Sequence, residues 1–159
     1  MADDNVVKLR PRGRRDDPPP ELVEMLRSVI EALDELGGGF EHIKPGLHWS
    51  AGRWSSRSMS FRMQRVPAAR QLKELHHIDP ADWPDVAWAS ELSSVRCAFE
   101  QQLDSIAILL DMLLHANMPP DERAWQIERF VAEGKGFLEA LWQLRKVIVA
   151  RYPEVRQMP

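Results

Sequence analysis

The sequence has little cysteine and no long apolar run. Cys97 is the only cysteine among 159 residues, so the chain cannot form an internal disulfide, which is typical of a reducing compartment. No apolar stretch approaches the roughly 18 residues that a membrane-spanning helix needs, and the N-terminus lacks the apolar core of a secretory signal. These absences predict a cytoplasmic protein. The apolar neighbours of Cys97 favour a small buried side chain over a nucleophile.

Signatures of catalysis and of metal binding are also missing. The chain has no glycine-rich phosphate loop, nucleophile elbow or Ser-His-Asp pattern. Its five histidines include no pair at metal-ligand spacing on a helix. Four polar residues, Glu100, Asp104, Asp111 and His115, do fall near one helix face, but a metal site in a helical bundle usually draws matched ligands from other helices. We therefore interpret them as a solvated face, and we predict no metal and no cofactor.

Acidic residues are absent from one long segment, His42 to Lys73. This segment carries a charge of +7, while the whole chain carries −3, so the remainder carries about −10. The cations are Lys44, Arg53, Arg57, Arg62, Arg65, Arg70 and Lys73. Such an asymmetry indicates either an internal electrostatic match with the helices or an acidic outside partner.

The C-terminal half carries two long helical patterns, from about Pro84 to Tyr152, broken once at 117–120. Apolar residues recur every three or four positions in both patterns, as an amphipathic helix requires. The break, Asn-Met-Pro-Pro, is short, so we expect a second helix over about Pro120 to Arg151 that lies antiparallel to the first. Within it, Gly134 and Gly136 indicate either a close approach by a helix or bulky side chain, or a hinge.

The N-terminal part is predicted to contain one more helix and an arm. The helix runs from about Pro20 to Leu36 and is ended by Gly37-Gly38-Gly39. Residues 1–19 mix proline with charge of both signs, which predicts a disordered basic arm: either a solvated tail or a segment that orders on nucleic acid or on a partner. We place a single helical domain at 20–153 and a frayed tail at 154–159.

The middle of the chain departs from the helical period. Alternating apolar residues on both sides of a turn-rich stretch predict a β-hairpin over 46–66, with Pro67 to His77 forming a short helix after it. The sequence therefore predicts a mainly α fold: an antiparallel pair of long helices packed with an N-terminal helix, plus a small β-hairpin insertion. Two strands alone are barely stable, so the hairpin should pack on the helices.

Aromatic and basic residues alternate in this predicted hairpin. Together they have the composition of a surface that stacks bases and grips phosphates. The candidate partner-binding residues are Trp49, Arg53, Trp54, Arg57, Arg62 and Arg65. The alternative is that the aromatics face the core while the arginines pair with acids of the helices; the negative total charge favours this alternative.

One short motif suggests an enzyme. Arg70 and His76, separated by five residues, resemble the arginine–histidine motif of the HEPN helical ribonucleases. That resemblance implies metal-independent RNA cleavage, in which the arginine steadies a phosphate and the histidine transfers protons. Gln71 follows the arginine where the family often has Asn, Asp or His, and the pair precedes the two long helices.

The leading hypothesis is a non-enzymatic interaction or assembly protein that self-associates, as a homodimer or in a larger complex. The predicted hairpin and the arm would contact the partner. Four tryptophans on or beside the long helices suggest a second apolar surface: Trp83, Trp88, Trp125 and Trp142. A nucleic-acid-binding regulator is the second hypothesis, and a HEPN-like ribonuclease is the third.

Overall fold

The structure is a computed structural model that describes residues 20–43, 49–76 and 86–156. Its helices are α1 (Pro20–Glu41), α2 (Ala51–Arg57), α3 (Met59–Leu75), α4 (Val86–Leu113), α5 (Pro120–Arg151) and the 3-10 helix η4 (Pro153–Arg156). The described residues contain no strand. The prediction of a mainly helical fold is therefore confirmed. None of these helices is long and apolar enough to cross a membrane.

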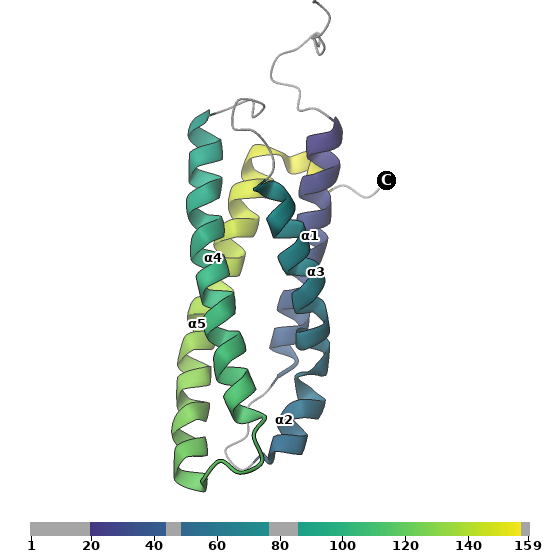
Figure 1. Ribbon diagram of the computed structural model, residues 1–159. Coiled ribbons are helices and arrows are strands. Elements are labelled where there is room, and N and C mark those ends of the chain that lie inside the picture. The colour runs from purple at the N-terminus through teal and green to yellow at the C-terminus, as the bar shows by residue number, and fades with distance from the viewer. Residues whose placement is uncertain (1–19, 44–48, 77–85, 157–159) are drawn as a thin grey trace, which may run out of the picture.

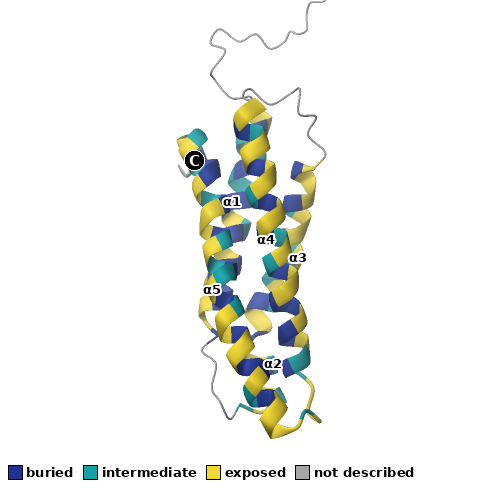
Figure 2. Ribbon diagram, turned by 90° about the vertical axis from the view of Figure 1, so that its left-hand side faces the viewer, coloured by how far each residue is buried: buried dark blue, intermediate teal, exposed yellow. Residues whose placement is uncertain are grey.

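The long helices lie side by side as an elongated bundle (Figure 1), and the chain reverses direction from each to the next. α1 packs beside α3, α4 packs beside α5, and α1 also contacts α5 and η4. The short α2 lies at the same end of the bundle as the turn between α4 and α5. Buried residues face the interior of the bundle, as Figure 2 shows.

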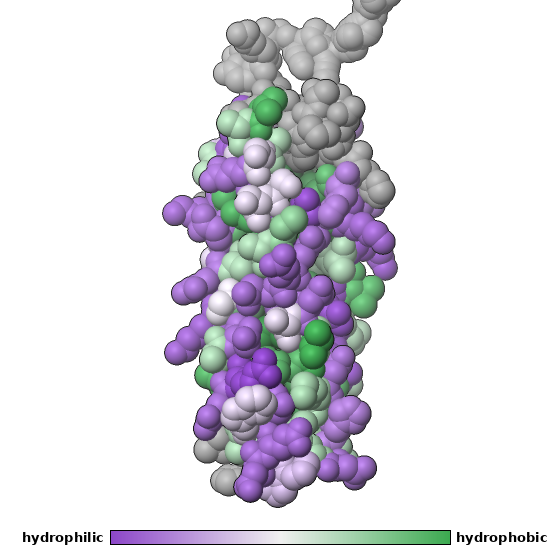
Figure 3. Space-filling view, turned by 60° about the vertical axis from the view of Figure 1, so that its left-hand side comes forward, coloured by the Kyte–Doolittle hydropathy of each residue, from purple (hydrophilic) through white to green (hydrophobic). Residues whose placement is uncertain are grey.

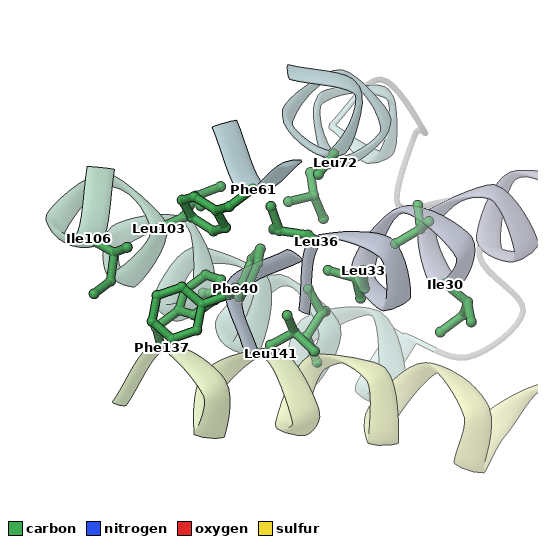
Figure 4. Close-up of a cluster of buried hydrophobic side chains, with 14 of the residues drawn as sticks. Ile30, Leu33, Leu36, Phe40, Phe61, Leu72, Leu103, Ile106, Phe137 and Leu141 are labelled. Carbon is green, nitrogen blue, oxygen red and sulfur yellow. The ribbon is translucent and has the colours of Figure 1, made fainter. Parts of the chain in front are cut away.

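A cluster of phenylalanines connects the helices in the core. Phe40 of α1 has its ring centroid 5.4 Å from that of Phe61 on α3 and 4.9 Å from that of Phe137 on α5. Phe99 of α4 lies 5.6 Å from Phe137. Figure 4 shows Phe40, Phe61 and Phe137 among leucines and isoleucines. Four helices thus share one apolar cluster, and burial of such rings is a large part of the stabilisation of a core.

The β-hairpin predicted over 46–66 is wrong, because residues 51–57 and 59–75 are the helices α2 and α3. The same segment that shows the strand-like alternation also contains apolar residues at helical spacing. The buried residues of the two helices are separated by seven, seven, four and three positions: Trp54, Phe61, Ala68, Leu72 and Leu75. The short helix predicted to begin at Pro67 is in fact part of α3, which contains Pro67 in its interior.

The glycines that were predicted to end the first helix lie inside it. α1 continues to Glu41. A Cβ at Gly39 would lie 3.1 Å from the Phe61 Cα and backbone nitrogen, so glycine lets α1 and α3 approach closely. Tertiary contact explains why this glycine-rich stretch stays helical.

The two long C-terminal helices agree with the sequence. α5 has the predicted bounds, Pro120–Arg151, and the break before it is confirmed. The described part of α4 begins at Val86. Of the two interpretations of the glycines, close approach by a bulky side chain is confirmed at Gly134, where a Cβ would lie 2.8 Å from Phe40 Cζ.

The prediction of a buried Cys97 is wrong. Cys97 is exposed, because it lies on the outer side of α4 and not among the core residues. Residues 154–156 of the predicted frayed tail belong to η4, in which Val155 is buried and the Glu154 carbonyl accepts a hydrogen bond of 3.1 Å from Arg27 Nη2. The rest of that tail, 157–159, lies outside the described residues. The predicted arm, 1–19, lies outside the described residues.

Candidate partner-binding surface

α2 begins at a side-chain cap. The Ser50 hydroxyl accepts a 3.2 Å hydrogen bond from the Arg53 backbone N–H, which satisfies one of the free donors of the first turn. In the helix that begins at this cap, Trp54 faces the core. Its side chain is 0% exposed, and its ring lies edge-on to Phe130 of α5 at 5.3 Å. Trp54, predicted to contact a partner, is therefore a core residue that anchors α2.

Trp49 lies just before α2 and stays half-buried. Its ring contacts Trp54 at 5.1 Å. The guanidinium carbons of Arg53 and Arg57 lie 5.5 Å and 5.8 Å from the Trp49 centroid. Two cations on one aromatic ring form an arrangement that is electrostatically favourable and partly open to solvent. We call Trp49, Arg53 and Arg57 the Trp49 cluster.

Arg62 joins α2 to α3 at the bend between them. Its Nε donates to the buried Ser58 hydroxyl at 3.1 Å, and its Nη2 donates to the Ser55 carbonyl at 3.0 Å. The hydrogen bond to the Ser55 carbonyl satisfies an acceptor in the last turn of α2 that has no backbone partner within the helix. Arg62 was predicted to bind a partner, and the structure gives it a structural role as well.

The outer side of α3 carries an exposed apolar row. Met59, Met63 and Val66 are 50%, 65% and 59% exposed. Their spacing of four and three, continued by the exposed Arg70 four residues later, places them on one helix face. We call Met59, Met63, Val66 and Arg70 the α3 row. In a strand, Met59 and Met63 would share one face with Phe61. In the helix α3 they lie on a different face from Phe61, which is buried.

The cations of α2 and α3 make no ion pair with an acid anywhere in the described chain. They are Arg53, Arg57, Arg62, Arg65, Arg70 and Lys73. Arginines elsewhere do pair: Arg145 Nε lies 2.7 Å from Asp34 Oδ1, and Arg96 Nη1 lies 3.2 Å from Glu100 Oε1. The described chain therefore does not show the predicted alternative, in which acids of the helices neutralise these arginines.

The predicted arginine–histidine pair is not brought together by any described contact. Arg70 is exposed on α3. His76 Nε2 lies 3.4 Å from Glu100 Oε2 and also contacts the guanidinium of Arg96, both on α4. His76 and Glu100 line a groove between α3 and α4, whose lining also includes Leu72 and Leu103. The ribonuclease hypothesis stays a prediction.

The carboxylates of α4 do not gather into a metal site. Glu100 contacts Arg96 and His76, and Asp104 lines the same groove. Among the described residues, no three histidine, cysteine or acidic side chains are grouped closely enough to hold a metal ion.

The four tryptophans of the predicted second apolar surface differ in their burial. Trp88 is buried, and its indole N–H donates to the Val147 carbonyl at 2.9 Å. Trp125 and Trp142, both on α5, are 55% and 50% exposed. Trp83 lies outside the described residues. On the face drawn in Figure 3, hydrophobic residues form small patches between hydrophilic ones.

Comparison of the chain with protein-family models, with curated proteins and with solved structures found no match.

Proposed function

We propose that this protein is a non-enzymatic interaction module that binds an acidic, amphipathic helix of a partner protein along α3. The observation that carries the proposal is the α3 row beside unpaired cations. Met59, Met63 and Val66 are exposed at the spacing by which one helix packs on another. Methionine suits such a surface because its flexible, polarisable side chain adapts to different partners.

Charge supports an acidic partner. Two cations lie near Val66 on the helix surface, because Arg62 precedes it by four residues and Lys73 follows it by seven. Cations therefore border the apolar row. Arginine binds carboxylates through two parallel hydrogen bonds, and the exposed guanidinium of Arg70 has no acid partner in the described chain. A partner helix with apolar residues on one side and glutamates at its flanks would match both features.

Nucleic acid is the second candidate, favoured by the Trp49 cluster. A half-buried indole beside two guanidiniums offers stacking and phosphate contacts. The α3 row supports it less well, because methionine and valine offer no flat ring to a base. The aromatics Trp54 and Phe61, which the sequence had placed beside these arginines, are buried in the core.

Fluorescence anisotropy tests the choice. A labelled acidic amphipathic peptide and a labelled single-stranded RNA are each titrated with the wild type and with Met63→Glu and Arg70→Glu. We expect the peptide to bind and each substitution to weaken it roughly tenfold, because the first places a charge in the apolar contact and the second repels the glutamates. Arg129→Glu, an exposed charge reversal on α5, is the matched control and should bind normally.

Two outcomes would reject the α3 proposal. One is no peptide binding, or binding that Met63→Glu leaves unchanged. The other is tight RNA binding with a steep dependence on salt that Arg53→Glu with Arg57→Glu abolishes, which would replace the protein partner by nucleic acid.

A further inference from the structure

Trp142 is an exposed aromatic side chain with an arginine beside its ring. Its side chain is half exposed on the outer side of α5. The guanidinium carbon of Arg145 lies 5.9 Å from its centroid, and Arg145 is itself held by Asp34 of α1 through Nε–Oδ1 and Nη2–Oδ2 contacts of 2.7 Å and 3.3 Å. Tryptophan is common among the residues that dominate interfaces.

A hollow lies beside Trp142, between α4 and α5. Small residues, Ala98, Gly136 and Ala140, are part of its lining. A Cβ at Gly136 would lie 3.2 Å from Gln102 Oε1. The absence of a side chain at Gly136 therefore leaves the surface recessed at this point. The hollow is therefore formed where the side chains of α4 and α5 are shortest.

The rim of the hollow carries one acid and one base. Glu139, Gln143 and Lys146 all line it together with Trp142. Glu139 and Lys146 are exposed, and neither makes an ion pair within the described chain. Positions 135, 139, 142, 146 and 149 alternate in steps of four and three, the spacing with which one helix packs along another.

The surface formed by Trp142, the hollow, Glu139 and Lys146 can pair with the same surface of a second copy. If two copies of α5 cross in antiparallel directions about a two-fold axis midway between Glu139 and Lys146, each Glu139 faces Lys146 of the partner subunit. Trp142 then faces Gln143 of the partner subunit, one of the residues that line the opposite hollow. A two-fold interface requires this property, because the same patch must serve both copies.

We propose that α5 forms a homodimer contact in which Trp142 of each copy enters the hollow of the other and Glu139 pairs with Lys146 of the partner subunit. The contact is separate from the α3 row and does not depend on the proposed function. One half-exposed tryptophan and its rim bury less than the roughly 1,000 Å² of a stable interface. The dimer should therefore dissociate in the micromolar range.

Sedimentation velocity over a wide concentration series tests the contact. We expect the wild type to shift from monomer to dimer as concentration rises, and Trp142→Ala to raise the dissociation constant at least tenfold. Trp125→Ala removes the other exposed tryptophan of α5, which also stacks with an arginine, Arg129 at 5.1 Å. This matched control should dimerise like the wild type, and circular dichroism verifies that every variant is folded.

Exchanging the two charges distinguishes the proposed Glu139–Lys146 pairing from nonspecific association. Glu139→Lys and Lys146→Glu should each weaken the dimer, because each places like charges together. The double variant should restore it, because the pairs are re-formed with their signs exchanged. A wild type that stays monomeric, a dimer unaffected by Trp142→Ala, or a double variant no better than the single ones would overturn the proposal.

Discussion

Single residues decide how closely the helices approach. Gly39 and Gly134 are both packed against phenylalanines of other helices, Phe61 and Phe40. Sequence reasoning identified the role of Gly134 as one of two alternatives, because a glycine inside a helical pattern costs stability and needs a compensating contact. It misassigned Gly39, because a run of three glycines also fits the end of a helix.

Gly134→Ala should destabilise the protein, although alanine favours a helix. The new methyl group would lie 2.8 Å from Phe40 Cζ, whose ring is enclosed by other rings of the core and cannot move away freely. Overpacking costs about 1–3 kcal/mol, and the gain in helix propensity offsets about 1 kcal/mol of it. Urea unfolding should show a net loss of about 1 kcal/mol.

Gly38→Ala is the control with the opposite sign. Gly38 is exposed, and nothing lies within 4 Å of its added Cβ. Only the propensity gain applies, so the free energy of unfolding should rise by up to about 1 kcal/mol. Equal effects of the two substitutions would contradict the packing argument.

At the scale of elements, the ends of the helices are defined by different means. Ser50 begins α2, and Pro120 begins α5. The end of α4 depends on a distant side chain: Arg123 of α5 is buried, and its Nη1 donates to the Leu113 carbonyl at 2.7 Å while its Nη2 donates to the His115 carbonyl. A cation at the C-terminus of a helix also interacts favourably with the helix dipole.

Arg123→Met should destabilise the connection between α4 and α5. Methionine keeps much of the side-chain volume but cannot donate, so two carbonyls lose charged hydrogen bonds and part of the loss is recovered by water. We expect urea unfolding to show a loss of about 2–3 kcal/mol. Arg129→Met, at an exposed position of the same helix, should stay within about 0.5 kcal/mol of the wild type. Similar values for both variants would refute the capping role.

At the scale of the whole molecule, two closely packed pairs share one core. α1 packs mainly with α3, and α4 mainly with α5. The apolar cluster nevertheless runs through all four long helices and includes Trp54 of α2, Tyr152 at the end of α5 and Val155 of η4. The hydrogen bond from the Trp88 indole to the Val147 carbonyl adds a further connection between α4 and α5.

We expect unfolding to be a single cooperative transition, because separating the pairs would expose the shared phenylalanine cluster. Urea curves from far-ultraviolet circular dichroism and from tryptophan fluorescence should coincide within error. Measurement at a few micromolar, repeated at a second low concentration, keeps self-association from contributing. Curves with different midpoints would show that one helix pair unfolds before the other.

The sequence by itself determined the helical class, the break before Pro120 and the bounds of α5, because apolar spacing and the two prolines act locally. The tertiary structure decided the middle of the chain: alternation suggested strands there, but Trp54, Phe61 and Leu72 gain more by facing the core as helices α2 and α3. It also decided which arginines stay unpaired and which tryptophans stay exposed. These depend on which helices become neighbours, and local spacing carries no information about that.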